Sequence, residues 1–137
     1  MKFFFFTLAL TAGGAFAAAP PRADLTTLVA SIVERFPAEA ATQRDALCAE
    51  ILKLGPNAVA EICARVAPPG KGDDSKARFA VSGLAVYATR PGAEGERVLL
   101  ARALLEALGR AGDGQVAAFF LSQVQLVGRR ESVRPLE

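Results

Sequence analysis

The chain lacks several residues on which common functions depend: it has no histidine, no tryptophan and only two cysteines among 137 residues. Histidine is the commonest metal ligand and a frequent general base. Its absence excludes histidine-dependent catalytic triads and histidine-containing zinc sites within this chain, whereas carboxylate chemistry stays open. No spaced pair of carboxylates stands out either, so we expect a protein that is not an enzyme and that uses no cofactor and no metal.

The sequence also lacks a concentration of charge of one sign. The formal net charge is only +2, and the arginines and lysines are scattered among acidic residues. Nucleic-acid-binding domains carry basic residues grouped in a patch or stripe. Nucleic acid is therefore not an expected partner.

A third absence concerns strands, because no segment alternates apolar and polar residues over a useful length. The length suits one domain, and a hydrophobic content of 52% is typical of a folded core. Apolar residues recur instead at helical spacing. These observations predict an all-α fold of stacked antiparallel helical hairpins.

Residues 1–19 have the composition of a signal peptide. Lys2 gives a positive start, and residues 3–12 are nearly all apolar. Two small-x-small sequences predict cleavage after Ala17 or after Ala19. The apolar run is too short for a comfortable membrane span, although an uncleaved anchor stays open as an alternative.

The leader predicts an exported protein, periplasmic or secreted, with no membrane span after cleavage. A Pro-rich spacer follows at 20–23, and the helical-repeat domain is expected over 24–137.

Periodicity and helix-breaking residues predict the helices of this domain. Asp24 and Asp113 are the expected caps of the first and last helices. The helices are expected over about 24–36, 38–54, 56–67, 75–89, 94–110 and 114–128. The side chains predicted to face inward include Leu28, Phe79, Tyr87, Val98, Ala101, Leu105, Leu108, Phe119 and Phe120. Gly83 is expected to permit a close helix approach.

The clearest turn lies at Gly55-Pro56, where one apolar helix ends and another begins. Glycine closes a helix easily, and proline suits the first position of the next. Cys48 and Cys63 lie at similar distances on either side of this turn, so they are expected at the same height on facing helices. Two states stay open for them. Export permits a disulfide, whereas the usual spacing of packed helices favours two buried free thiols.

The segment 68–74 is the most polar loop of the mature chain, and it precedes a helix. It resembles neither a phosphate loop nor a calcium loop, because the required spacing of glycine, lysine and carboxylates is missing. We predict that it forms a partner-binding edge with the start of the next helix. The residues expected to contact the partner are Lys71, Asp73, Asp74, Lys76 and Arg78.

Two junctions along the chain share a pattern: an apolar helix ends at glycine, and a valine follows with a further aliphatic residue three positions on. This pattern resembles the inter-helix junction of HEAT repeats, where Leu-Gly-x-x-x-x-Val-x-x-Leu is common. Residues 72–87 are also similar to the N-terminal region of long, exported bacterial HEAT-repeat proteins. The junctions are Leu54-Gly55-Pro56-Asn57-Ala58-Val59 and Leu126-Val127-Gly128-Arg129-Arg130-Glu131-Ser132-Val133-Arg134-Pro135-Leu136.

The resemblance covers residues 38–137 and implies an α-solenoid that binds another protein and carries no catalytic residues. Repeats bury their apolar faces on one another, and Val133 and Leu136 need such a neighbour. Further repeats of a longer chain are therefore expected after residue 137. The alternative is a helical bundle that binds a small apolar ligand or supports an enzyme domain beyond residue 137.

Overall fold

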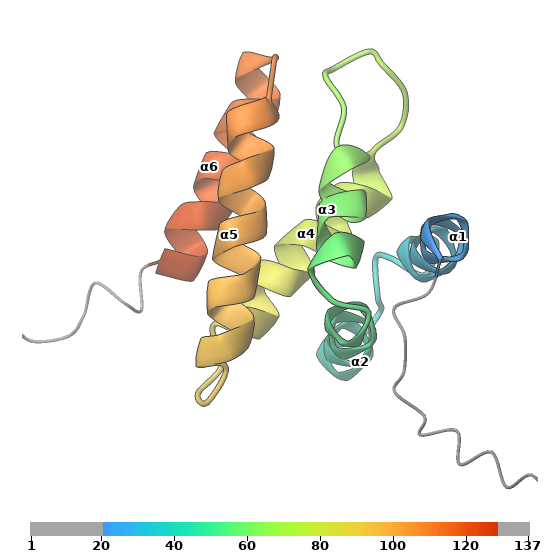
Figure 1. Ribbon diagram of the computed structural model, residues 1–137, viewed down its shortest axis with the longest axis vertical. Helices are drawn as coiled ribbons and strands as arrows, with labels where there is room; N and C mark the ends of the chain where they lie inside the picture. The colour runs from blue at the N-terminus through green and yellow to red at the C-terminus, as the bar shows by residue number, and fades with distance from the viewer. Residues whose placement is uncertain (1–20, 129–137) are drawn as a thin grey trace, which may run out of the picture.

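The computed structural model describes residues 21–128, and over this range the chain is all-α, with no strand (Figure 1). The predicted leader at 1–19 and the end of the second junction, 129–137, lie outside the described residues. Within the described range the helices are α1 (Arg22–Val33), α2 (Ala41–Lys53), α3 (Pro56–Ala64), α4 (Ser75–Ala88), α5 (Glu94–Arg110) and α6 (Gly114–Gly128).

Each helix packs on the helix after next. α3 contacts α1 on one side and α5 on the other, while α4 contacts α2 and α6 in the same way. The helices therefore form one row of α1, α3 and α5 and a second row of α2, α4 and α6. The expectation that consecutive helices pair as neighbours holds for α5 and α6, which pack along their length, but α1 and α2 touch only slightly.

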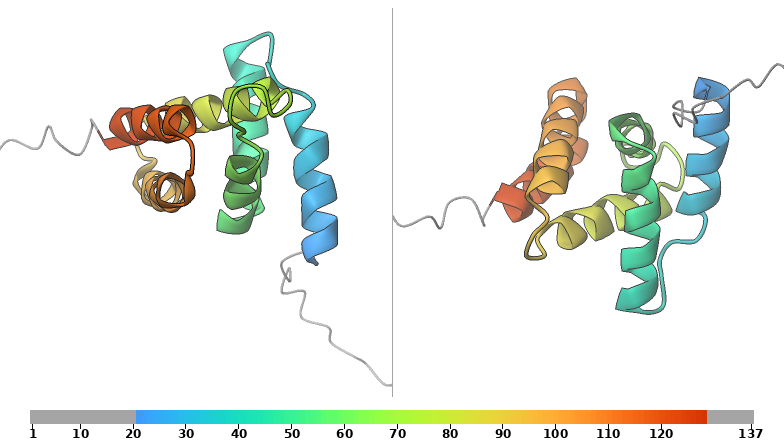
Figure 2. Two further views of the ribbon diagram at one scale, coloured as in Figure 1. Left: turned by 90° about the horizontal axis from the view of Figure 1, so that it is seen from above. Right: turned by 60° about the horizontal axis from the view of Figure 1, so that its bottom comes forward.

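The helix direction turns along these rows. Figure 1 views α1 and α2 nearly end-on, whereas α5 and α6 lie along the plane of the picture. The two views of Figure 2 show the same change of direction, with α4 crossing obliquely between the first helices and the last. The stacking is therefore strongly twisted.

The predicted turn between α2 and α3 is confirmed. Gly55 has a φ of +91°, a conformation that other residues rarely adopt, and Pro56 is the first residue of α3. The turn takes only Leu54 and Gly55, and α3 then lies beside both α1 and α5.

Gly83 marks the closest approach of α4 to α2, as predicted. A methyl group added at Gly83 would lie 3.3 Å from Cγ of Arg44 and 3.4 Å from Sγ of Cys48. It would also lie 3.4 Å from the ring of Phe36, just after α1. Gly83 therefore keeps the two helices close because it has no side chain.

Several predictions of buried side chains are wrong. Leu105 is 54% exposed and Val98 is 52% exposed, because α5 turns a different side toward α3, α4 and α6. Leu100, Ala103 and Leu104 fill that side instead. Phe79 (51% exposed) and Leu28 also lie largely in solvent, on the sides of α4 and α1 that no described helix covers.

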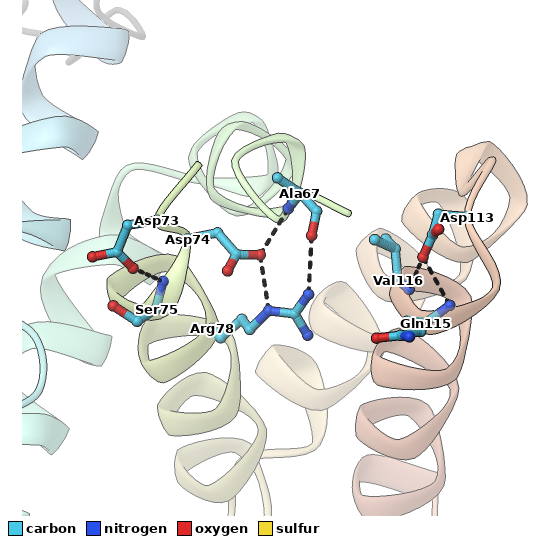
Figure 3. Close-up of polar contacts among 8 residues, drawn as sticks. All are labelled: Ala67, Asp73, Asp74, Ser75, Arg78, Asp113, Gln115 and Val116. Carbon is cyan, nitrogen blue, oxygen red and sulfur yellow. Dashed lines mark hydrogen bonds and ion pairs between the residues drawn. The ribbon is translucent and has the colours of Figure 1, made fainter. Parts of the chain in front are cut away.

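One of the two predicted helix caps is also wrong. α1 begins at Arg22, before Asp24, and its start has no side-chain cap. Asp24 therefore lies within the first turn, where its charge favours the helix N-terminus. Asp113 does cap α6: its Oδ1 accepts hydrogen bonds from the backbone N–H of Gln115 (2.8 Å) and Val116 (3.1 Å) (Figure 3).

Candidate functional site

The loop at 68–74 is fastened by a carboxylate at its end. Oδ2 of Asp74 accepts a hydrogen bond from the backbone N–H of Ala67 at 2.8 Å, and it pairs with Nε of Arg78 at 2.8 Å. Nη2 of Arg78 in turn donates to the carbonyl oxygen of Ala67 at 3.1 Å (Figure 3). Two of the five predicted partner-binding residues thus hold the chain after α3 against the start of α4.

Of the other three predicted residues, Lys76 in the first turn of α4 contacts the end of α1. Nζ of Lys76 is 2.5 Å from Oε2 of Glu34, just after α1. Oδ1 of Asp73 accepts a hydrogen bond from the backbone N–H of Ser75 at 3.0 Å. The Ser75 hydroxyl and then its backbone N–H lower the pKa of Asp73 below its ordinary value. Only Lys71 of the five has a side chain without a partner among residues 21–128.

Arg78 also links α4 to α6, and this contact could not be predicted from the sequence. Its guanidinium carbon lies 4.8 Å from the centre of the Phe119 ring. Phe119 packs edge to face on Phe120, with ring centres 5.5 Å apart. The side chain therefore joins the loop, α4 and the aromatic pair of α6, and it is already engaged within the chain.

The two cysteines are free thiols, and both are buried. They face different neighbours: Cys48 lies against α4 at Gly83, whereas Cys63 lines a cavity shared with α5 and α6. Burial raises the pKa of each thiol to about 12. A protonated, buried thiol is a poor nucleophile and a poor metal ligand.

That cavity, of about 360 Å³, lies between α3 and α5 and also takes residues from the start of α6. Small side chains on both helices leave the space open. In the sequence, the cavity corresponds to pairs of alanines four residues apart in each helix. Such a spacing does not by itself indicate a cavity. The lining includes Ala60, Ala64, Ala103, Ala107, Cys63, Val116 and Phe120.

Three charged residues also line the cavity: Glu106 and Arg110 on α5, and Asp113 before α6. Glu106 and Arg110 are exposed, and neither forms a hydrogen bond or an ion pair with another residue of the described range. The cavity thus combines apolar walls with charges that are available to a ligand.

A second charged cluster lies at the turn from α4 to α5. The guanidinium of Arg90 lies 3.6 Å from the centre of the Tyr87 ring and 2.5 Å from the carboxylate of Glu96. Arg97 is only 6% exposed, and its nearest acidic oxygen, on Glu94, is 3.6 Å away. The Nε of Arg97 has no hydrogen-bond partner in the described structure. The burial of Arg97 was not predicted. The long apolar stem of an arginine packs well against apolar neighbours, and this stem accounts for the burial.

The comparisons with known proteins add no assignment: no family model, no curated protein and no solved structure matches the chain. Between residues 21 and 128, no helix has the length and apolar character needed to cross a membrane. Over the same range, no three or more acidic or cysteine side chains gather as a metal site would require. The class that the described residues define is an all-α protein with helices packed in two rows.

Proposed function

We propose that the chain is an exported helical-repeat scaffold, similar to HEAT-repeat proteins, that binds another protein and catalyses no reaction. The observation that carries this proposal is the packing of each helix on the helix after next. In α-solenoids, repeats contact their neighbours in this way, and the stacked rows leave extended surfaces for partners. Export rests on the signal-peptide composition of residues 1–19.

The cavity between α3 and α5 is the proposed contact point with the partner. It is the place where the described surface combines a concave apolar lining with unpaired charges at Glu106 and Arg110. Protein interfaces concentrate their binding energy where an anchoring side chain fills such a pocket. The loop at 68–74 contributes less, since Asp74 and Arg78 already bind each other.

The same cavity favours one alternative, a carrier of a small apolar ligand. Its volume of about 360 Å³ is within the range of small-molecule pockets, toward the lower end. A carrier would hold its ligand without a protein partner, and this difference can be measured.

The proposal is tested by placing a photo-reactive amino acid at Glu106 of the full chain in living cells. Glu39, an exposed acidic residue before α2 that does not line the cavity, is the matched control position. We expect an adduct with one other protein from position 106 and none from position 39. Mass spectrometry identifies that protein, and its affinity for the purified chain is then measured.

The second experiment compares a substitution that fills the cavity with the same substitution elsewhere on the surface. Ala64→Trp places a large side chain at an exposed residue of the lining, and Ala118→Trp makes the same change on the exposed side of α6. The scaffold proposal requires that only Ala64→Trp weakens binding of the identified partner. Adducts from both positions alike, or equal binding by both variants, would overturn it.

A further inference from the structure

The ends of three helices meet around the cavity between α3 and α5. Ala64 is the last residue of α3, Arg110 is the last residue of α5, and Asp113 directly precedes α6. A helix C-terminus carries a partial negative charge from its unpaired carbonyl groups, and a helix N-terminus carries a partial positive charge. Two negative ends and one positive end therefore face this space.

The positive charges around the cavity, the N-terminus of α6 and the side chain of Arg110, are already partly neutralised within the chain. The N-terminus of α6 is occupied by Asp113, whose Oδ1 accepts two backbone hydrogen bonds. Arg110 lies in the last turn of α5, where its charge offsets that helix end. The last turn of α3 contains no basic residue, and Arg65, which directly follows α3, pairs with Glu61 at 3.6 Å.

Glu106 adds a full negative charge at the cavity, and it has no partner among the described residues. Among the charged side chains of the lining, two are acidic and one is basic. The balance of side chains and helix ends is therefore negative, and it favours a positively charged group beside the opening.

The interior of the cavity favours an apolar group and not a charged one. Cys63, Val116 and Phe120 are buried apolar residues of the lining, and burial raises the pKa of the Cys63 thiol to about 12, so this thiol is uncharged. The volume of about 360 Å³ is close to the lower limit for small-molecule sites. Such a space suits one large apolar side chain that anchors a longer molecule.

We propose that the cavity between α3 and α5 binds a peptide segment of a partner protein in which a large apolar residue is next to lysine or arginine. The apolar side chain enters between Cys63 and Phe120, and the neighbouring cation pairs with Glu106. This inference rests on the proposed scaffold function and specifies the chemistry of the segment that the scaffold binds.

Two dipeptides test the charge preference directly. The uniformly ¹⁵N-labelled full chain is titrated with N-acetyl-Leu-Lys-amide and, separately, with N-acetyl-Leu-Glu-amide, and amide resonances are followed by NMR. We expect saturable shifts at Cys63, Ala107 and Val116, which line the cavity, with tighter binding of the lysine peptide. Equal binding of the two peptides, or no shifts at these residues, would overturn the inference.

Substitutions locate the interaction. Glu106→Gln is expected to weaken binding of the lysine peptide about two- to fivefold, the usual effect of losing an exposed ion pair. Glu39→Gln removes the same charge away from the cavity and is expected to leave binding unchanged. Ala64→Trp should abolish the shifts and Ala118→Trp should preserve them. An unchanged affinity in Glu106→Gln, or preserved shifts in Ala64→Trp, contradicts the inference.

Hexylammonium serves as the third probe, because it joins an apolar group to a cation without a peptide backbone. It is expected to bind more weakly than the lysine peptide. If hexylammonium bound equally or more tightly, the inference would be wrong, and the ligand of the cavity would be a small amphipathic amine and not a peptide. A different result tests the scaffold function: it is contradicted if cross-linking at position 106 captures no protein. If a partner is captured through an acidic segment, only the charge preference is contradicted.

Discussion

The carboxylate of Asp74 lies 2.8 Å from Nε of Arg78, and both side chains also bind the backbone of Ala67. Two hydrogen bonds thus join the end of the long loop and the start of α4 to the chain that leaves α3, and a third links the two side chains to each other (Figure 3). Because both side chains are partly buried, the pair is screened less than an ion pair on the open surface. The loop is therefore held by a small polar network and not by apolar packing.

The first prediction concerns this network. Asp74→Asn is expected to lower the free energy of unfolding by about 1–2 kcal/mol, because the charged acceptor of two hydrogen bonds is lost. Arg78→Met should have a similar effect, and the double variant should lose less than the sum of the two. Urea unfolding measures all three.

Lys71→Ala is the matched control for these variants. Its side chain lies in the same loop without a partner in the described range, so the expected change is within about 0.5 kcal/mol. Strict additivity of the Asp74 and Arg78 substitutions would show that the two side chains do not act together.

The second prediction compares two glycines within helices. Gly109→Ala on α5 meets open space, so it is expected to stabilise the protein by up to about 1 kcal/mol through helix propensity. Gly83→Ala gains the same propensity, but its methyl group would lie 3.3 Å from Cγ of Arg44 and 3.4 Å from atoms of Cys48 and Phe36, with no space to spare. Overpacking of this kind costs about 1–3 kcal/mol. Thermal unfolding should therefore rank Gly109→Ala above wild type and Gly83→Ala at or below it.

A larger side chain sharpens the comparison. Gly83→Val should destabilise strongly, since the neighbouring side chains of Cys48 and Phe36 are buried and cannot move away. If Gly83→Val were as stable as Gly109→Val, α2 and α4 would not approach as closely as the structure has them.

Local chemistry made much of the fold predictable. The Gly55-Pro56 turn, the cap at Asp113 and the close approach at Gly83 each depend on residues whose conformational preferences are strong. Helix existence and order followed from periodicity and breakers, and only the ends moved by a few residues. The turn, the cap and the order of the helices need no knowledge of distant neighbours.

The buried side of α5 could not be predicted in the same way. Leucines at 99, 100, 104, 105 and 108, together with several alanines, place apolar residues around most of the helix. Which of them are buried depends on the directions of α3, α4 and α6. The cavity was equally hidden, because it exists only where alanines of two separate helices meet. The bond from Arg78 to Ala67 depends on the path of the loop.

The third prediction concerns pH. In the folded protein, burial raises the pKa of Cys48 and Cys63 from 9.0 to about 12. The unfolded chain therefore loses these protons first as the pH rises, so the contribution of each thiol to stability is constant below pH 9 and declines from there toward pH 12. At pH 10 the decline amounts to about 1 kcal/mol per thiol, since one pKa unit corresponds to about 1.4 kcal/mol.

Urea unfolding at pH 8 and pH 10, with reductant present, checks this decline. The loss of stability between the two pH values should be smaller in Cys63→Ala than in the wild type by about 1 kcal/mol. An identical loss in both proteins would mean that the folded thiol ionises normally. Thiol titration of the unfolded, unreduced chain separately distinguishes two free thiols from a Cys48–Cys63 disulfide.

The fourth prediction uses two adjacent leucines of α5. Leu104 is fully buried, whereas Leu105 is more than half exposed. Leu104→Ala should therefore lower the free energy of unfolding by about 2–5 kcal/mol, through lost burial and the cavity left behind. Leu105→Ala removes the same atoms from a position in solvent, and the expected change is within about 0.5 kcal/mol. Chemical unfolding of the two variants measures both values at one protein concentration.

The pair also tests which side of α5 is covered. If Leu105→Ala were as destabilising as Leu104→Ala, the side of α5 that carries Val98 and Leu105 would be buried in solution by a neighbour. Repeating the measurement at tenfold lower concentration then identifies that neighbour: a second copy of the chain dissociates on dilution, so the difference from wild type would shrink. A dilution-independent loss would instead place a segment of the same chain on this side.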